Sequence, residues 1–584
     1  MSYERCMELK LFLASVFVLG ILSTMLFTLF FTLFYVVGMI PWYILLSFTL
    51  LVNFLVWLFG PYVSDWMFRF FYKLQWIGIE GLERRDKEIA DLVRRICRKN
   101  NIKVPKIGYI NDDNPTSFTY GSAAFNARIV FTEGIFTYLD REEIKTVLAH
   151  EVGHVVHRDF IVLTIASVFV QLFYQLYKIG AESSKGGEKK KGGAAAVAAV
   201  GYVFYIIGNY IVLYLSRLRE YYADEFSARE TGNPNALSSA LIKIAYGIIK
   251  NPDKAQQLHL LKSTRSQNIF DFKIAKRIGL AYANASMSKS WKPVEGALLY
   301  DRYNPWATVS ELSSTHPMTG KRIASLCLIA QQIGQKPLFD MQTLFVKYNV
   351  DRERLYKNFG RDLFFMCMPV LFAIVLPVAY VLLSAPALHS LSAFISSPAF
   401  PTIAEPATGR IFFYAISMLS LLLCGIGIGS LVRVLYSFST STGFPKTTVA
   451  DLMGDIYTSP VRGKPARLKG RIVGRGVAGL IFSEDMMFQD STGLMYLNYE
   501  GLLPLVSNLA FALGRVKALV DKDCEIEGWF VRSIYQMIHL KDIAVGGEVI
   551  KSRVRLLGII ASAFWIIVGI AAFILVSAYI GIAF

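Results

Sequence analysis

Long apolar stretches separated by polar segments run along the whole chain of 584 residues. Each stretch is close to the roughly 20 apolar residues that a membrane-spanning helix requires. They lie at 11–35, 42–59, 160–177, 194–215, 363–383, 411–431 and 556–584. Because 54% of all residues are hydrophobic, we predict a multi-pass α-helical membrane protein with about seven spans.

Two of the polar segments, 61–158 and 217–358, have helical periodicity. In the first, apolar residues recur at helical spacing over 83–99 and predict an amphipathic helix. Residues 118–121 and 127–132, separated by turn-forming residues, predict a pair of short strands. An apolar hairpin interrupts the two segments, so together they predict one mainly helical domain that is split in the sequence.

A third polar segment near the end of the chain has the pattern of short strands. The predicted strands lie at 467–473, 486–489, 494–499, 525–532 and 536–540, with a helix-like stretch at 502–519. Five strands with a helix after the third is the order of an OB-fold barrel. The segment therefore predicts a small OB-like β-barrel domain.

These patterns divide the chain into consecutive parts. We predict a transmembrane hairpin at 1–60, the first part of the helical domain at 61–158, a second hairpin at 159–216, the second part of that domain at 217–358, a third hairpin at 359–436, the β domain at 437–555 and a last transmembrane helix at 556–584.

The net charge of +17 raises the question of nucleic acid as a partner. In the β domain, Arg467, Lys469, Arg471 and Arg475 follow one another along one strand. Base-stacking aromatic residues would be needed beside them, but Tyr496, Tyr499 and Trp529 are not clustered with them in the sequence. We therefore expect the basic residues to meet the anionic surface of a lipid bilayer and expect no nucleic acid partner.

Basic residues also predict which side of the membrane each polar segment occupies. Arg5 and Lys10 precede the first apolar stretch and a basic segment follows the second, which predicts that both ends of the first hairpin are cytoplasmic. Four lysines in the loop 180–193 oppose this topology, but the long basic segments on either side outweigh them. The loop 384–409 has no Lys or Arg and is predicted to be external.

The residues with the clearest chemistry form an HExxH motif within 146–157. His150 and His154 are four residues apart and so leave the same face of a helix, where both imidazoles can reach one zinc ion at about 2.1 Å. Glu151 lies beside them, in the position of a general base. HExxH also occurs by chance in ordinary helices, so the motif predicts a zinc site only if a third ligand exists.

Glu220 and Asp224 provide that third ligand and its support. They follow the second hairpin, which returns the chain to the side of HExxH, and they are again four residues apart on one helical face. We predict that Glu220 binds the single zinc ion and that Asp224 accepts the outer N–H of a ligating histidine. His157 lies about 10 Å along the helix from His150, too far to share the metal.

We also predict where a peptide substrate lies. The strand at 127–132 is taken as an edge strand on which an extended peptide pairs main chain to main chain, with Ala127, Ile129 and Phe131 as substrate-binding positions. An ordinary hairpin beneath the active helix is the alternative that the sequence leaves open.

The motifs at 146–159, at 216–224 and at 314–317 with Arg322 occur in the order found in the HtpX family of membrane zinc endopeptidases, kin to the CAAX prenyl proteases. The chain resembles that family over roughly 1–330. The resemblance implies a gluzincin-type domain with Glu220 as third ligand and His316 stabilising the oxyanion. It also implies cytoplasmic cleavage of misfolded membrane proteins in the plasma membrane of a prokaryote.

Two alternatives remain open from the sequence. One is a processing enzyme like the CAAX prenyl proteases, which place most of their spans before HExxH, whereas only two precede it here. The other is a non-catalytic membrane scaffold whose OB-like domain binds a ligand. The intact HExxH motif and the Glu220 and Asp224 pair favour an enzyme.

Overall fold

The computed structural model describes Met25 and residues 42–183, 191–250, 272–384, 408–475, 485–502, 508, 511–532 and 536–582. The predicted stretch at 11–35, apart from Met25, lies outside these residues, as do 184–190 of the predicted loop 180–193 and 385–407 of the predicted loop 384–409. The chain forms two compact units, one of Met1–Ser286 with Trp291–Val350 and one of Met287–Ser290 with Asp351–Phe584.

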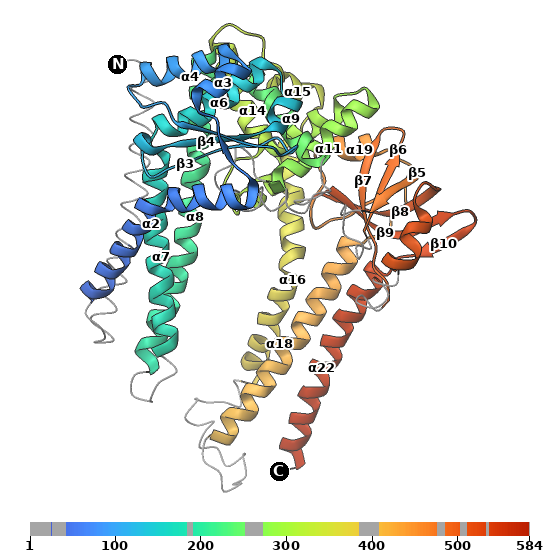
Figure 1. Cartoon of the computed structure of the whole chain (residues 1–584). Helices are drawn as coiled ribbons and strands as arrows, with labels where there is room; N and C mark the ends of the chain where they lie inside the picture. Colours follow the sequence, from blue (N-terminus) through green and yellow to red (C-terminus); the bar gives the residue numbers. More distant parts are fainter. Residues whose placement is uncertain are drawn as a thin grey trace. The chain divides into compact units, whose positions relative to one another are not determined.

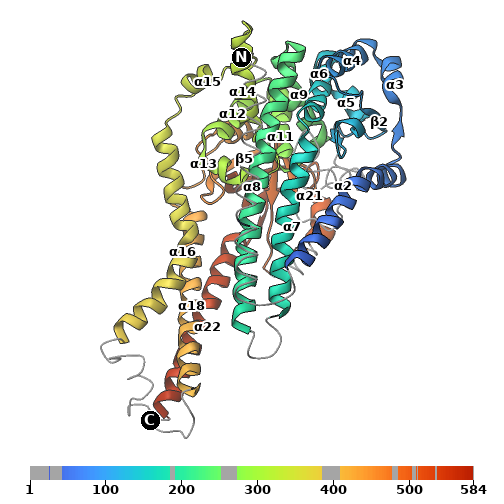
Figure 2. The same ribbon diagram turned by 90° about the vertical axis from the view of Figure 1, so that its left-hand side faces the viewer.

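The first unit is mostly helical (Figures 1 and 2). Its helices are α2 (Trp42–Tyr72), α3 (Gly78–Arg85), α4 (Lys87–Lys99), α5 (Glu133–Tyr138), α6 (Arg141–Val156), α7 (Asp159–Ser183), α8 (Lys191–Thr231), α9 (Pro234–Lys250), α11 (Phe272–Ser288), α12 (Lys292–Tyr303), α13 (Pro305–Glu311), α14 (Thr319–Gln332) and α15 (Met341–Lys347). The helix predicted over 83–99 is two helices, because Asp86 is extended and its carboxylate caps α4 through the N–H groups of Glu88 and Ile89.

A four-stranded sheet completes this unit. Its strands β1 (Gln75–Trp76), β2 (Lys106–Ile110), β3 (Ser117–Tyr120) and β4 (Arg128–Thr132) lie in the order β1-β2-β4-β3. The predicted pair β3 and β4 is present and antiparallel.

The prediction that 127–132 is an edge strand is wrong. β4 has β2 on one side and β3 on the other, so its main chain has no free edge for a peptide. Ala127 precedes the strand, and the side chains of Ile129 and Phe131 are buried in the core. The edge strand next to β4 is β3.

Five helices among the described residues are long and apolar enough to cross a membrane. They are Asp159–Glu182, Gly193–Thr231, Arg352–Leu382, Tyr414–Ser437 and Val554–Val576, each over a predicted apolar stretch. α7 and α8 pack side by side (Figures 1 and 2). α8 continues unbroken for 41 residues, so the helix that contains the apolar stretch also carries Glu220 and Asp224.

The second unit has three long apolar helices and a barrel. α18 (Thr408–Ser437) packs on α16 (Arg352–Ser384) and on α22 (Val554–Ile582). Gly425 and Gly429 let α18 approach the backbone of α16 closely, because a Cβ at either position would collide with the carbonyl of Phe372 or Met368. A short helix, α19 (Val449–Gly454), precedes the barrel.

The barrel strands are β5 (Lys464–Arg475), β6 (Met486–Asp490), β7 (Gly493–Asn498), β8 (Asp523–Arg532) and β9 (Gln536–Val545). β5, β6 and β7 pair antiparallel in turn, β7 pairs parallel with β9, and β8 closes the barrel between β9 and β5. All five predicted strands are present. A sixth, β10 (Glu548–Lys551), pairs with β9 and was not predicted.

The segment between β7 and β8 is helical in part, with a π-helical turn at Phe511–Arg515 and α21 at Val516–Leu519. Two basic residues of β5 lie next to acidic residues of the neighbouring strand β8. Arg467 pairs with Glu527, and Lys469 lies 3.5 Å from Glu525. These cations are therefore partly neutralised within the barrel.

Candidate active site

α6 places the HExxH residues in the interior of the first unit. The helix begins with a capping box in which Asp140 and Glu143 bond reciprocally to backbone N–H groups. His150 and Glu151 are buried. α6 ends at His157, and Arg158, with a φ of 57°, turns the chain directly into α7.

His150, His154 and Glu220 come together as the sequence predicts. One ligand atom from each lies within 4.8 Å of the others. The two Nε2 atoms are 3.2 Å apart, and the Glu220 oxygens lie 3.6 Å from Nε2 of His150 and 3.5 Å from Nε2 of His154. Atoms bound tetrahedrally to zinc at about 2.1 Å are about 3.4 Å apart, so these three groups fit a metal ion.

Gly153 permits this arrangement. It lies on α6 between the two histidine positions, and a Cβ there would be only 3.0 Å from the ring of Phe226 on α8. The absence of a side chain lets α8 cross α6 closely enough for Glu220 to reach the histidines.

Each of the two histidines has a carboxylate next to Nδ1, the ring nitrogen on the side away from Glu220. Nδ1 of His150 is 3.0 Å from Oδ1 of Asp224, although the two atoms are not in hydrogen-bond geometry, and Nδ1 of His154 is 2.6 Å from Oδ2 of Asp159. Asp159, the first residue of α7, was not predicted as a site residue. A carboxylate at Nδ1 keeps the proton there and leaves the Nε2 lone pair free for a metal.

Two buried arginines neutralise these carboxylates. Arg322 on α14 donates to Asp224 from Nε at 2.7 Å and from a terminal nitrogen at 2.6 Å. Arg219 on α8 forms an ion pair with Asp159. Because both arginines are almost fully buried, each ion pair fixes the position of the carboxylate that orients a histidine.

The charges around the histidines also favour a cation. Burial alone would lower the pKa of His150, but the carboxylates of Asp224 and Glu220 outweigh burial and raise it to about 9. Oε2 of Glu220 is buried and makes no hydrogen bond to a described residue, although the Arg322 guanidinium lies 3.4 Å away. Leaving a buried carboxylate oxygen unsatisfied is costly, and a metal ion between Glu220 and the imidazoles would remove that cost.

Glu151 is held by β3. One of its carboxylate oxygens accepts a hydrogen bond from the hydroxyl of Thr119, while the other, Oε1, has no hydrogen-bond partner among the described residues. Burial raises the pKa of Glu151, and the two neighbouring histidines act in the opposite direction. Thr119 was missed because a single threonine in a short strand carries no recognisable signal.

His316 also reaches the site. Its Nε2 is 3.6 Å from Oε1 of Glu220, and its Nδ1 is 2.8 Å from the hydroxyl of Thr315. The next helix, α14, begins at Thr319. His316 lies on the preceding loop, which Arg217 holds by donating to the carbonyls of Glu311 at 2.9 Å and Ser314 at 2.8 Å.

His157 lies outside the cluster. Its ring packs edge-on against Phe226, with centroids 5.5 Å apart, and burial lowers its pKa to about 4. A neutral histidine against an aromatic ring is a packing residue. Tyr222 has its ring beside His157.

Two histidines and a glutamate grouped around one point form a candidate metal site in a chain with several membrane-spanning helix candidates. The pattern of Peptidase family M48 matches residues 83–329. A "Protease HtpX homolog" of Aeropyrum pernix is 32% identical over 290 residues, which are 48% of this chain and 83% of the relative. Another, of Methanothermobacter thermautotrophicus, is 32% identical over 238 residues, 41% of this chain and 85% of the relative.

The chain therefore belongs to the HtpX proteases of peptidase family M48, and it is a membrane metalloprotease with peptide or protein substrates. The family resemblance expected from the three motifs is confirmed. The crystal structure of S. mikatae Ste24p covers 55% of this chain and 67% of its own at 17% identity, with a TM-score of 0.31, a likeness too weak to carry an argument.

Proposed function

We propose that the chain is a zinc-dependent endopeptidase of the gluzincin type. His150, His154 and Glu220 hold one zinc ion and leave a fourth position for water or substrate. The observation that carries this proposal is the spacing of 3.2–3.6 Å between their donor atoms. Bound zinc supplies a Lewis acid that lowers the pKa of water toward 7.

The other groups of the site have separate roles. Glu151 accepts the proton of the attacking water, and the Thr119 hydroxyl holds its carboxylate in place. His316, positioned by Thr315, donates a hydrogen bond to the carbonyl oxygen as negative charge develops on it. Asp224 and Asp159 keep the ligating histidines in the tautomer that exposes Nε2.

The free edge of β3 is the place for an extended peptide. β4 occupies only one side of β3, and no other described strand pairs with it. Since Thr119 of β3 touches Glu151, a peptide paired along this edge passes directly beside the general base. This assignment replaces the one on β4.

We further propose the membrane topology, the side of the membrane that carries the active site, and the class of substrate. The five described candidates, with the apolar stretches before Phe59, support about seven spans. The basic segments support a cytoplasmic active site, and the resemblance of the three sequence motifs to the HtpX family motivates quality control of misfolded membrane proteins as the role. The barrel order β5-β6-β7-β9-β8 supports an OB-type accessory domain.

The test uses detergent-purified full-length protein. Wild type, Glu151→Gln and the control Glu142→Gln, an exposed position on the same helix, are given zinc and an unfolded test protein. We expect cleavage by wild type and Glu142→Gln, abolition by a chelator, and loss by at least about a hundredfold in Glu151→Gln with zinc content unchanged.

Equal cleavage by Glu151→Gln would refute its role as base. Cleavage restricted to prenylated carboxyl-terminal peptides would move the assignment to the CAAX type. Zinc binding without any cleavage would favour the non-catalytic scaffold.

A further inference from the structure

A cavity of about 440 Å³ lies in the second unit where α18, α22 and the barrel meet. Its walls come from α18 between Ile426 and Ser437, from Phe438 directly after that helix, from α22 between Gly558 and Trp565, and from barrel residues that include Val531 and His539. Its volume is in the range of sites that hold small molecules or parts of lipids. Neither the catalytic residues nor the family match, which ends at 329, extends to it.

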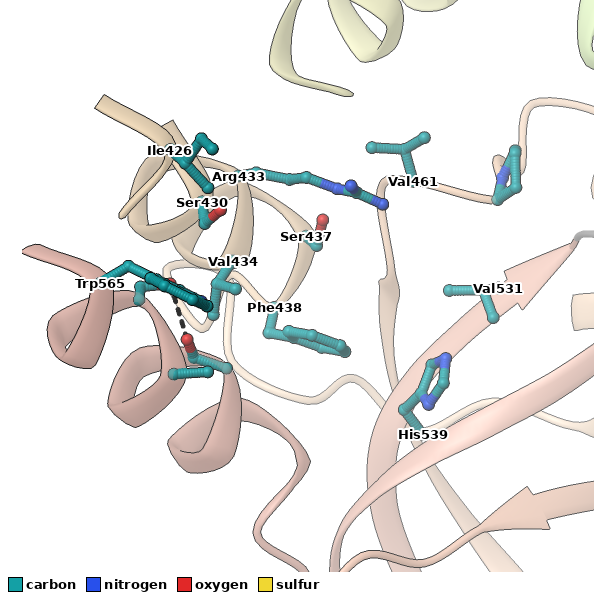
Figure 3. Close-up of a pocket in the computed structure, with 14 residues that line it drawn as sticks. Ile426, Ser430, Arg433, Val434, Ser437, Phe438, Val461, Val531, His539 and Trp565 are labelled. Carbon is teal, nitrogen blue, oxygen red and sulfur yellow. Dashed lines mark hydrogen bonds between the residues drawn. The ribbon is translucent and has the colours of Figure 1, made fainter. Parts of the chain in front are cut away.

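The cavity is lined by both apolar and polar side chains. Ile426, Val434 and Trp565 belong to the membrane-span candidates Tyr414–Ser437 and Val554–Val576. Arg433, Ser437 and His539 also line the cavity (Figure 3). Along α18, Ile426 to Ser437 spans about 17 Å, which is long enough for a phospholipid headgroup and the first part of an acyl chain.

Arg433 provides a positive charge without a counter-ion in the cavity. Its side chain is exposed and reaches toward the loop that carries Val461 (Figure 3). None of the 14 lining residues is acidic. The nearby Arg462 differs, since its guanidinium lies 3.5 Å from Asp362. Basic pockets between membrane helices attract the phosphate of anionic lipids.

We propose that this cavity binds an anionic phospholipid. Its phosphate lies against Arg433 and the Ser437 hydroxyl, and the upper part of an acyl chain follows Ile426 and Trp565. Phe438, in the cavity wall, packs edge-on against Trp529 at 5.2 Å and against His539 at 5.6 Å between ring centroids. The lipid thus contacts both the membrane helices and the side chains that attach α18 to the barrel.

The competing explanation is unspecific attraction of any basic residue at a helix end to headgroups. Arg361 on α16 is a matched control, because it lies as close to its predicted apolar stretch, 363–383, as Arg433 lies to 411–431. The Arg361 side chain is exposed and donates a hydrogen bond of 3.1 Å to Asn358. It does not line the cavity. Unspecific attraction predicts equal losses from both substitutions.

The experiment is native mass spectrometry of the full-length protein in mild detergent, titrated with phosphatidylglycerol or phosphatidylcholine. We expect one phosphatidylglycerol to remain bound to wild type and to Arg361→Gln, with an affinity reduced roughly fivefold or more in Arg433→Gln. Phosphatidylcholine should bind less tightly than phosphatidylglycerol. Ala561→Phe, an exposed lining position, should reduce binding by filling the apolar part without changing the charge.

Equal affinity in wild type and Arg433→Gln would overturn the proposal, as would equal losses in Arg433→Gln and Arg361→Gln. Inorganic phosphate separates the two sources of a phosphate group. If millimolar phosphate displaces the lipid fully, the site recognises free phosphate and the lipid assignment is wrong. If the lipid stays bound, the apolar wall contributes as proposed.

Discussion

Replacement of Asp159 by asparagine tests how the site orients its ligands. Asp159 accepts from Nδ1 of His154 at 2.6 Å and pairs with the buried Arg219 through its other oxygen. In Asp159→Asn, the arginine will take the amide oxygen as its acceptor. The amide NH₂ then faces Nδ1, which favours the tautomer protonated on Nε2, and that tautomer cannot bind a metal.

The magnitude follows from two separate effects. Loss of an outer carboxylate lowers metal affinity by about 10- to 100-fold, which is about 1.4–2.7 kcal/mol. Arg219, with 2% of its side chain exposed, also loses its counter-ion. Breaking such a buried pair costs about 3–5 kcal/mol of stability.

Zinc affinity is measured by competition with a chelator, and stability by the apparent unfolding temperature of the metal-free protein. Arg219→Met added to Asp159→Asn removes the cation that Asp159 neutralises in the wild type, so it should recover stability without recovering zinc affinity. Wild-type zinc affinity in Asp159→Asn would refute the reasoning. Full recovery of affinity in the double variant would show that the charge, and not the tautomer, controls binding.

Three further predictions concern single residues. Thr119→Val removes the hydrogen bond to Glu151 and should slow cleavage about tenfold or more with zinc retained, whereas Thr119→Ser should keep the wild-type rate; equal initial rates for Val and Ser would contradict this role. His316→Ala should lower kcat by about 10²–10³ with little change in KM, and a purely KM effect in steady-state kinetics would contradict oxyanion stabilisation. Burial lowers the pKa of His539 in the barrel to about 4, so between pH 6.5 and 4 the unfolded chain binds a proton that the folded chain does not. The free energy of unfolding should therefore decrease as the pH is lowered from 6.5 to 4, by at most about 3 kcal/mol. The unfolding temperature of His539→Gln should depend less on pH than that of the wild type.

The spacing of apolar and polar residues within single helices and strands was enough to predict the membrane spans, the barrel strands and the pairing of the site residues. The apolar stretches, the barrel strands, and the placement of His150 with His154 and of Glu220 with Asp224 all depend on spacing within one element. Such spacing can be read directly from the sequence. The family motifs then connected the two helices.

The errors and omissions have nonlocal causes. β4 is internal because β2, which precedes both members of the predicted pair, inserts beside it, and strand order across a sheet is not visible in the alternation of residues. Asp159 reaches His154 only because Arg158 adopts a positive φ and turns α7 back. If α6 continued as a regular helix through residue 158, the side chain of Asp159 would not lie next to His154.

In the proposed site, Glu220 completes a three-ligand zinc centre, although a membrane hairpin separates it from HExxH in the sequence. X-ray absorption at the zinc edge, combined with zinc titration, tests it in wild type, Glu220→Gln and the control Glu225→Gln, whose carboxylate pairs with Arg229 at 2.9 Å on the same helix. We predict one zinc per chain with two imidazole and otherwise oxygen ligands, and affinity lost by about a hundredfold or more only in Glu220→Gln. Unchanged zinc affinity and an unchanged ligand shell in Glu220→Gln would show that Glu220 is not a zinc ligand.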